Sequence, residues 1–128
     1  TSYKTNTGQS TTGNITGVYD MSGGAFEYVM GNYNKTAGKS WLTVSEIPAE
    51  HIDIYSGISV SASHLGDATG ETADWYSDSW SFVEDSFPWF FRGGDNNVGG
   101  VTDMFGFYSN GGSDYKDLGF RVALSVKE

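Results

Sequence analysis

The hydrophobic residues of this chain fall into short runs that are separated by polar, glycine-rich stretches. Residues 24–30 form a mainly apolar and aromatic run around Glu27, which periodicity alone does not distinguish from a helical turn and which we interpret as a buried strand. Residues 89–92 and 120–126 are β-prone runs, and residues 104–108 are a third candidate strand. We therefore expect a small antiparallel sheet.

The remaining segments carry weaker patterns. Residues 41–54 alternate in a way that fits either a strand or a short amphipathic element, and residues 58–84 have the composition of loops and a short helix. We expect the aromatic residues within 58–84 to fill the core. Residues 1–16 contain almost nothing apolar, so we expect an extended N-terminal segment followed by one domain over residues 17–128.

Composition narrows the fold class. A chain of 128 residues has the length of a single hydrophobic core. Aromatic residues make up 16% of it, so large flat side chains must supply much of the buried area. The 18 glycines disfavour long helices, since glycine costs about 1 kcal/mol relative to alanine inside a helix. These features predict an α+β fold with an aromatic-rich core and much irregular loop structure.

The charge balance excludes several classes of partner. Sixteen acidic residues against seven basic ones give a formal net charge of −9, which repels nucleic acid and anionic membrane surfaces. No apolar run approaches the roughly 20 residues of a membrane span, so we expect no membrane insertion by this segment. The absence of cysteine excludes disulfides and thiolate metal sites.

Three motifs resemble a known family. Residues 17–29 read Gly-Val-Tyr-Asp-Met-Ser-Gly-Gly-Ala-Phe-Glu-Tyr-Val, with Arg-Gly-Gly at 92–94 and Gly-Phe-Arg at 119–121. The first stretch is similar to the Gly-Leu-Tyr-Asp-Met-x-Gly-Asn-Val-Trp-Glu-Trp signature of the formylglycine-generating-enzyme-like (sulfatase-modifying-factor) domains, and the other two follow in the same order. The resemblance covers about residues 17–124 and implies a C-type-lectin-like fold, which is a mixed α+β arrangement.

The chain departs from the enzymes of that family. The oxygenase members bind copper with a cysteine pair, which is missing here, and His51 and His64 lack the spacing of a non-haem iron site. We therefore interpret both as ordinary surface or loop histidines and expect no enzymatic activity. Four acidic residues of the middle segment are interpreted as a solvated face: Asp74, Asp78, Glu84 and Asp85.

The scaffold has a second known use, as the variable protein of diversity-generating retroelements. In these proteins adenine-directed reverse transcription rewrites AAY codons to NNY, which cannot encode Trp, Lys, Gln, Glu or Met. Residues 95–115 contain no Trp, Lys, Gln or Glu and a single Met, whereas Asn, Asp, Tyr, Ser and Gly dominate. Glycine-rich turns would show much of the same composition without any such history. With the resemblance beside it, this bias predicts a variable region over about residues 89–124.

Residues in and beside this segment are the candidate ligand-binding set. Tyrosine offers large contact area at low rotamer cost, and Asn, Asp and Ser offer adaptable hydrogen bonds. The alternative for Phe105 and Phe107 is core packing, because strand alternation over 104–108 must bury one of its two faces. The full set is Phe91, Asp95, Asn96, Asn97, Val98, Asp103, Phe105, Phe107, Tyr108, Asn110, Asp114 and Tyr115.

Glu27 lies inside an apolar run, where an unpaired carboxylate would be costly to bury. The family resemblance implies one solution, a structural calcium held by oxygen ligands from Ser22, Gly23, Ala25 and Glu27. A salt bridge from Arg92 or Arg121 would neutralise Glu27 equally well. Apart from this candidate calcium, no cofactor is expected.

Together these observations predict a non-catalytic, receptor- or adhesion-type variable protein for an unknown protein or glycan ligand, displayed on a bacterial cell surface or a phage particle. The alternative is a fixed structural or carbohydrate-binding adhesion module of a pilus-like or phage-tail protein. Comparison of the coding DNA with a nearby near-identical repeat would separate the two.

Overall fold

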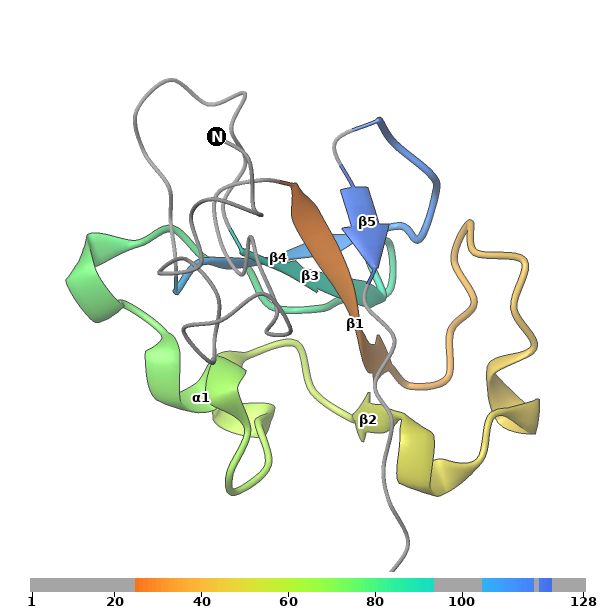
Figure 1. Ribbon diagram of the computed structural model, residues 1–128. Coiled ribbons are helices and arrows are strands. Elements are labelled where there is room, and N and C mark those ends of the chain that lie inside the picture. Colours follow the sequence, from red (N-terminus) through yellow and green to blue (C-terminus); the bar gives the residue numbers. More distant parts are fainter. Residues whose placement is uncertain (1–24, 94–104, 117, 121–128) are drawn as a thin grey trace, which may run out of the picture.

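The computed structural model describes residues 25–93, 105–116 and 118–120 (Figure 1). The predicted extended segment over residues 1–16, and the start of the domain at residue 17, lie outside the described residues.

The architecture is α+β, with one mixed five-stranded sheet and few helices among irregular loops. Its strands are β1 (Phe26–Tyr33), β2 (Asp53–Tyr55), β3 (Trp89–Arg92), β4 (Phe107–Asn110) and β5 (Leu118–Phe120). The strand predicted at 89–92 is confirmed, and the run at 24–30 is a strand that continues to Tyr33. In the described part of the chain, the third candidate strand begins at Phe107 and the C-terminal one already at Leu118.

The sheet is built around β1. One edge of β1 pairs with β3, which pairs in turn with β4, and both of these pairings are antiparallel. The other edge is shared end to end by β5, beside Phe26–Tyr28, and β2, beside Gly31–Tyr33, and both of these pairings are parallel. The prediction of an antiparallel sheet is therefore wrong for two of the strand pairs. The long connections on either side of β2 and before β5 allow the parallel direction, which a tight hairpin does not.

The helical elements are all short. They comprise the α-helix α1 (Ala68–Thr72) and the 3₁₀ turns η2 (Val44–Glu46), η3 (Ala49–His51), η4 (Val60–Ala62) and η5 (Trp75–Ser77). Residues 41–54 thus contain two 3₁₀ turns before the start of β2, and residues 58–84 hold the predicted short helix among loops. No helix in the described ranges has the length and apolar character needed to cross a bilayer.

The core is aromatic, as predicted. Tyr55, Phe82, Val83, Phe90 and Phe107 form the buried cluster. The Phe90 ring lies at its centre, with ring centroids 5.1 Å from Phe82, 5.5 Å from Tyr55 and 5.9 Å from Phe107, each in edge-to-face geometry. Such pairs contribute about 0.5–1.5 kcal/mol each beyond the area they bury. The packed centre of the described structure is therefore the junction of β2, β3 and β4.

Candidate functional site

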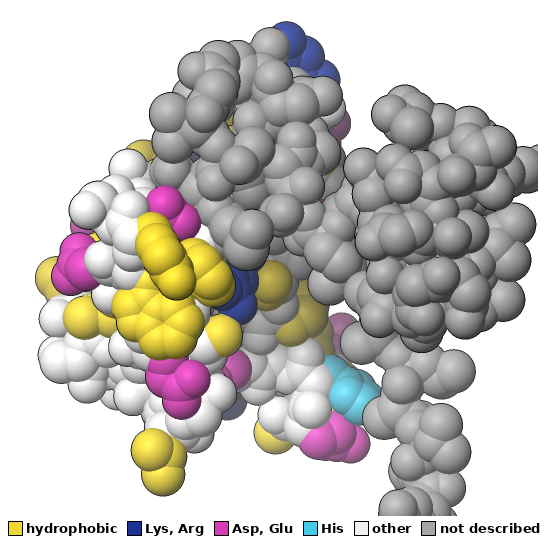
Figure 2. All heavy atoms as spheres, turned by 60° about the vertical axis from the view of Figure 1, so that its left-hand side comes forward, with side chains coloured by type: hydrophobic (Ala, Val, Ile, Leu, Met, Phe, Trp, Pro, Cys, Tyr) yellow, Lys and Arg dark blue, Asp and Glu magenta, His cyan; other side chains and the backbone are white. Residues whose placement is uncertain are grey.

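Three aromatic side chains form a surface group that we call the aromatic patch: Trp75, Tyr76 and Phe105. The Tyr76 ring stacks on the Phe105 ring with centroids 5.4 Å apart, and the Trp75 ring meets Phe105 edge-on at the same distance. Tyr76 is 84% exposed and Trp75 is 48% exposed. Figure 2 turns the side of the molecule that carries α1 and η5 toward the viewer, and hydrophobic side chains gather there next to acidic ones.

The backbone segment that carries Trp75 and Tyr76 has an unusual conformation. Asp74, Tyr76 and Ser77 have φ angles of 66°, 55° and 61°, in the left-handed region that costs an L-residue about 1–2 kcal/mol. Non-glycine residues in this region concentrate at functional sites, where the surrounding structure compensates their strain. This conformation turns the Tyr76 side chain outward instead of into the core.

Two carboxylates fix the ends of the patch. Asp74 Oδ1 accepts a hydrogen bond of 2.7 Å from Trp80 Nε1, and Asp78 Oδ2 accepts one of 2.9 Å from the Phe105 backbone N–H. Hydrogen bonds to ionised acceptors are about twice as strong as neutral ones. Asp74 and Asp78, interpreted from the sequence as solvated, are therefore structural supports of the patch.

The two phenylalanines of the candidate ligand set separate in the structure. Phe105 belongs to the aromatic patch, whereas Phe107 is completely buried against Phe90 and stacks on Trp80 at 5.7 Å. Phe107 as a ligand-facing residue is therefore wrong, and the alternative of core packing holds for it. The reason is that β4 begins at Phe107, so this side chain points from the sheet directly into the core.

Five other residues of the candidate set gather around Tyr28. The Tyr28 ring meets Phe91 at 6.4 Å, and Tyr108 stacks on Phe91 at 5.5 Å. The Tyr28 hydroxyl lies 2.8 Å from Asn110 Oδ1 and 2.7 Å from the Ser113 carbonyl oxygen. Burial, with smaller contributions from Tyr115 and Asp114, raises the pKa of Tyr28. The group therefore includes Phe91, Tyr108, Asn110, Asp114 and Tyr115.

Within this group, Asp114 borders a hollow on the surface. Asp114 lines a space of about 660 Å³ together with Ser113, Lys39, Leu42 and Trp41. Trp41 is 98% exposed. The Oδ1 atom of Asn110 already has two internal partners, because it also accepts a hydrogen bond of 2.9 Å from the Gly112 N–H. The residues free to contact a ligand here are therefore Asp114 and Tyr115, while Phe91, Tyr108 and Asn110 shape the surface beneath.

Some predicted site residues lie outside the described residues. In the candidate ligand set these are Asp95, Asn96, Asn97, Val98 and Asp103, and in the candidate calcium site they are Ser22 and Gly23. Of the other two calcium candidates, Ala25 is exposed and Glu27 is half-buried on β1. Glu27 is directly opposite Arg92 of β3 in the strand register, which places an acidic and a basic side chain at neighbouring positions. The calcium site stays a prediction.

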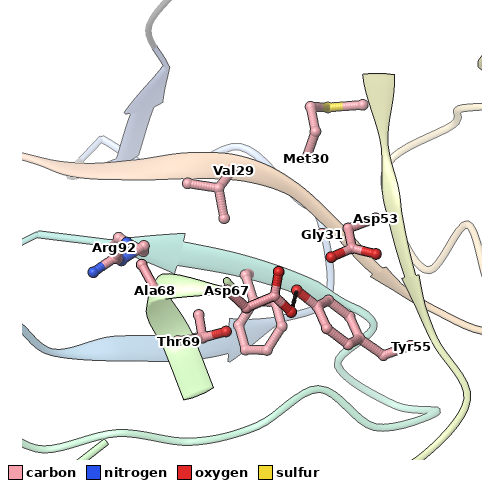
Figure 3. Close-up of a pocket in the computed structure, with 10 residues that line it drawn as sticks. Val29, Met30, Gly31, Asp53, Tyr55, Asp67, Ala68, Thr69 and Arg92 are labelled. Atoms are coloured by element: carbon pink, nitrogen blue, oxygen red, sulfur yellow. Dashed lines mark hydrogen bonds between the residues drawn. The ribbon is translucent and has the colours of Figure 1, made fainter. Parts of the chain in front are cut away.

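A cavity of about 190 Å³ with several polar groups in its wall lies on the side of the sheet that faces α1 (Figure 3). Asp67 accepts a hydrogen bond of 2.9 Å from the Tyr55 hydroxyl. Burial raises the pKa of Tyr55, and the bond to Asp67 and the charges of Asp53 and Asp67 raise it further. Burial also lowers the pKa of the Arg92 guanidinium, whose Nε has no hydrogen-bond partner among the described residues. The cavity therefore brings acidic, phenolic and basic groups together in one open recess.

Sequence reasoning missed the two most exposed members of the aromatic patch. Trp75 and Tyr76 were expected to fill the core, as Phe82 does and Trp80 partly does. A signal was present, because Asp74-Trp75-Tyr76-Ser77-Asp78 places two aromatic residues between polar neighbours without the alternation of a buried strand. His64 was also missed as a partner of Asp53 and Asp67, which lie 11 residues before and three after it.

No protein-family model, curated protein or solved structure matches this chain.

Proposed function

We propose that this chain is a non-catalytic ligand-binding module of the formylglycine-generating-enzyme-like type, with a C-type-lectin-like fold, and that its C-terminal loops present a diversified surface. The observation that carries the proposal is the stacking of Phe105, from the region expected to vary, on the exposed ring of Tyr76. This contact joins the expected variable region to a fixed aromatic surface.

The aromatic patch supports binding on physical grounds. Large aromatic side chains that gather on a surface mark interaction sites more often than scattered exposed residues do. Covering one such side chain contributes about 1.5–3 kcal/mol. Trp75 and Tyr76 both retain accessible ring area, which suits stacking on a sugar ring or on an apolar side chain of a protein ligand.

The way the two central strands are held supports tolerance to variation. β3 and β4 are paired over four residues each, from Trp89 opposite Asn110 to Arg92 opposite Phe107. Their inner side chains, Phe90 and Phe107, lie in the core. Strand pairing and core packing therefore keep the two ends of the segment 93–106 in place, which supports tolerance to substitutions between them.

Display on a bacterial cell surface or a phage particle, with a protein or glycan as ligand, is part of the same proposal. The alternative is a fixed carbohydrate-binding adhesion module, which the pairing of exposed aromatic rings with nearby carboxylates favours. Asp74 and Asp78 already accept internal hydrogen bonds, so they contribute less to sugar recognition than two free carboxylates would.

Diversification is tested on the genome of the source. A repeat nearly identical to the coding sequence of about residues 89–124 should lie near a reverse transcriptase gene, with mismatches confined to adenines of the repeat. Mismatches spread over all four bases, or the lack of any repeat, would contradict diversification. The fixed adhesion module would then be the favoured function.

Binding is tested with a glycan array and a surface-display screen of candidate protein ligands, followed by two matched variants. Trp75→Ala and Trp41→Ala remove the same side chain from two different exposed places. Trp75→Ala should weaken binding of any ligand found by at least about tenfold, the expected effect of one lost aromatic contact. If affinity is unchanged in Trp75→Ala and lost in Trp41→Ala, the ligand binds at the hollow beside Asp114 and not at the aromatic patch.

A further inference from the structure

His64 has acidic neighbours on two sides. Its Nδ1 lies 2.6 Å from Asp53 Oδ1, and its backbone N–H donates a hydrogen bond of 2.8 Å to Asp67 Oδ2. Asp53 opens β2, whereas His64 and Asp67 belong to the turn that precedes α1. One nitrogen and two carboxylate groups from separate segments are therefore brought together, and we call them the Asp53–His64–Asp67 cluster.

The cluster is held in place by its surroundings. The imidazole of His64 stacks on the Tyr55 ring with centroids 5.2 Å apart and planes inclined by 13°. The Tyr55 hydroxyl and the His64 N–H both donate to Oδ2 of Asp67, which fixes the plane of that carboxylate. Donors that orient a ligand side chain in this way are typical of the outer shell of metal sites.

The three residues of the cluster are near enough to share one metal ion if their side chains adjust. One potential ligand atom from each of the three residues lies within 4.8 Å of the other two. Tetrahedral ligands about 2.1 Å from one ion are about 3.4 Å apart, so a pair 4.8 Å apart must close by roughly 1.4 Å, while His64 Nδ1 and Asp53 Oδ1 must separate from 2.6 Å. The His64 and Asp53 side chains are both more than one third exposed, and side chains of this exposure can make that shift.

A second observation points to a bound species at this place. Thr69 is only 6% exposed; its hydroxyl is close enough to the Tyr55 hydroxyl to act on the pKa of Tyr55, but it makes no hydrogen bond of good geometry among the described residues. It lines the same cavity as Asp53 and Asp67, and Figure 3 shows its oxygen on the side toward Asp67 and Tyr55. A buried hydroxyl without a partner costs about 1–3 kcal/mol, and a water or ligand in the cavity removes that cost.

The charges around the cavity favour a cation at the end where the cluster lies. Asp53 and Asp67 contribute two carboxylates there, whereas Arg92 lies at the opposite end of the cavity from Asp53 (Figure 3). One imidazole nitrogen with two carboxylates is a ligand set of Zn²⁺, while Ca²⁺ takes oxygen ligands only. Three protein ligands also leave a fourth coordination position for water.

We propose that Asp53, His64 and Asp67 bind one Zn²⁺ ion whose remaining position faces the cavity, where a metal-bound water is within the surroundings of the Thr69 hydroxyl. His64 would ligate the ion through Nδ1 as a neutral imidazole that carries its hydrogen on Nε2. The site lies apart from the aromatic patch and does not depend on the proposed ligand-binding function.

The test is titration of the whole chain with zinc chloride by isothermal titration calorimetry, with two pairs of matched variants. His64→Gln is compared with His51→Gln, and Asp53→Asn with Asp85→Asn, which has the same change of charge at an exposed position. We expect one Zn²⁺ per chain, lost or weakened by more than about tenfold in His64→Gln and Asp53→Asn and kept in the two controls.

A second measurement needs no variant. Nitrogen-15 NMR of the two imidazoles in the unaltered chain should show a large zinc-induced shift at Nδ1 of His64 and none at His51. Absence of binding heat, equal weakening within each pair of variants, or equal shifts at both histidines would each mean adventitious binding to an acidic surface and would overturn the proposal. Calcium chloride that competes fully with zinc would overturn the assignment of the ion.

Discussion

The Tyr76 ring lies almost parallel to the Phe105 ring, inclined by 16° at a centroid distance of 5.4 Å. The two residues come from distant parts of the chain, one from η5 and the other from the segment just before β4. Their contact depends on the left-handed backbone at Tyr76 and Ser77. The aromatic patch therefore combines residues of the strained turn η5 with a residue just before the start of β4.

This strain predicts a stabilising substitution. Ser77 is exposed with a φ of 61°, so Ser77→Gly should raise the free energy of unfolding by about 0.5–1 kcal/mol, the left-handed penalty minus the larger unfolded-state entropy of glycine. Ser56→Gly, at an exposed position outside the left-handed region, should lower it instead. Urea denaturation measures both, and a loss of stability in Ser77→Gly would show that Ser77 is not strained.

The burial of Phe107 predicts a large loss. Phe107→Ala removes a completely buried ring and should lower the free energy of unfolding by about 3–5 kcal/mol. Tyr115→Ala removes an exposed ring and should change it by less than about 0.5 kcal/mol. Thermal and urea unfolding followed by circular dichroism compare the two, and similar losses would contradict the division of the candidate set into core and surface.

The strands that the sequence predicts best are those whose local pattern decides their structure. Trp89–Arg92 is an aromatic run next to a glycine pair, and it is a strand with the predicted ends. Strand direction could not be predicted in this way. Whether β2 and β5 run parallel or antiparallel to β1 depends on how the long connections return to its edge, which the local pattern does not specify.

The site was less predictable than the sheet for a related reason. Hydrophobic composition places Trp75 and Tyr76 in the core, whereas the left-handed backbone at Asp74 and Tyr76 exposes them. Left-handed conformations are enriched at aspartate but uncommon at tyrosine, so residue type signals Asp74 but not Tyr76. The same difficulty applies to Phe105 and Phe107, which are residues of one type two positions apart. Phe107 is the first residue of β4 and is buried, whereas Phe105 precedes the strand and belongs to the aromatic patch.

The polar cavity predicts a fall in stability at alkaline pH. Burial and the acidic neighbours raise the pKa of Tyr55 above its ordinary value of 10.0. The folded chain then keeps a proton that the unfolded chain releases above pH 10, so this contribution to stability is complete below pH 10 and is lost as the pH rises. Urea denaturation at pH 8 to 11 should show a free energy of unfolding that falls above pH 10. The free energy of unfolding of the Tyr55→Phe variant should fall less steeply. An equal fall in both proteins would show that the effect does not come from Tyr55.

Two glycines predict how tightly the turn after β4 packs. Gly66 and Gly112 have nearly the same φ, 91° and 90°, so alanine at either position has the same backbone strain of about 1–2 kcal/mol. A Cβ at Gly66 meets nothing within 4 Å, whereas a Cβ at Gly112 would lie 2.5 Å from Cδ1 of Trp89. The Trp89 ring cannot easily move away, because it is buried and its Nε1 donates a hydrogen bond of 2.9 Å to the Ala37 carbonyl.

Gly112→Ala should therefore lower the free energy of unfolding by an additional 1–3 kcal/mol or so relative to Gly66→Ala, because overpacking adds to the shared backbone strain. Urea denaturation of both variants measures the difference, in which the backbone contribution cancels. Tryptophan fluorescence of the folded Gly112→Ala variant should also shift, since the added methyl group displaces the Trp89 indole. Equal losses in the two variants, with unchanged fluorescence, would mean that the turn moves away from Trp89 at little cost and that its position is set by Tyr28 and Asn110 alone.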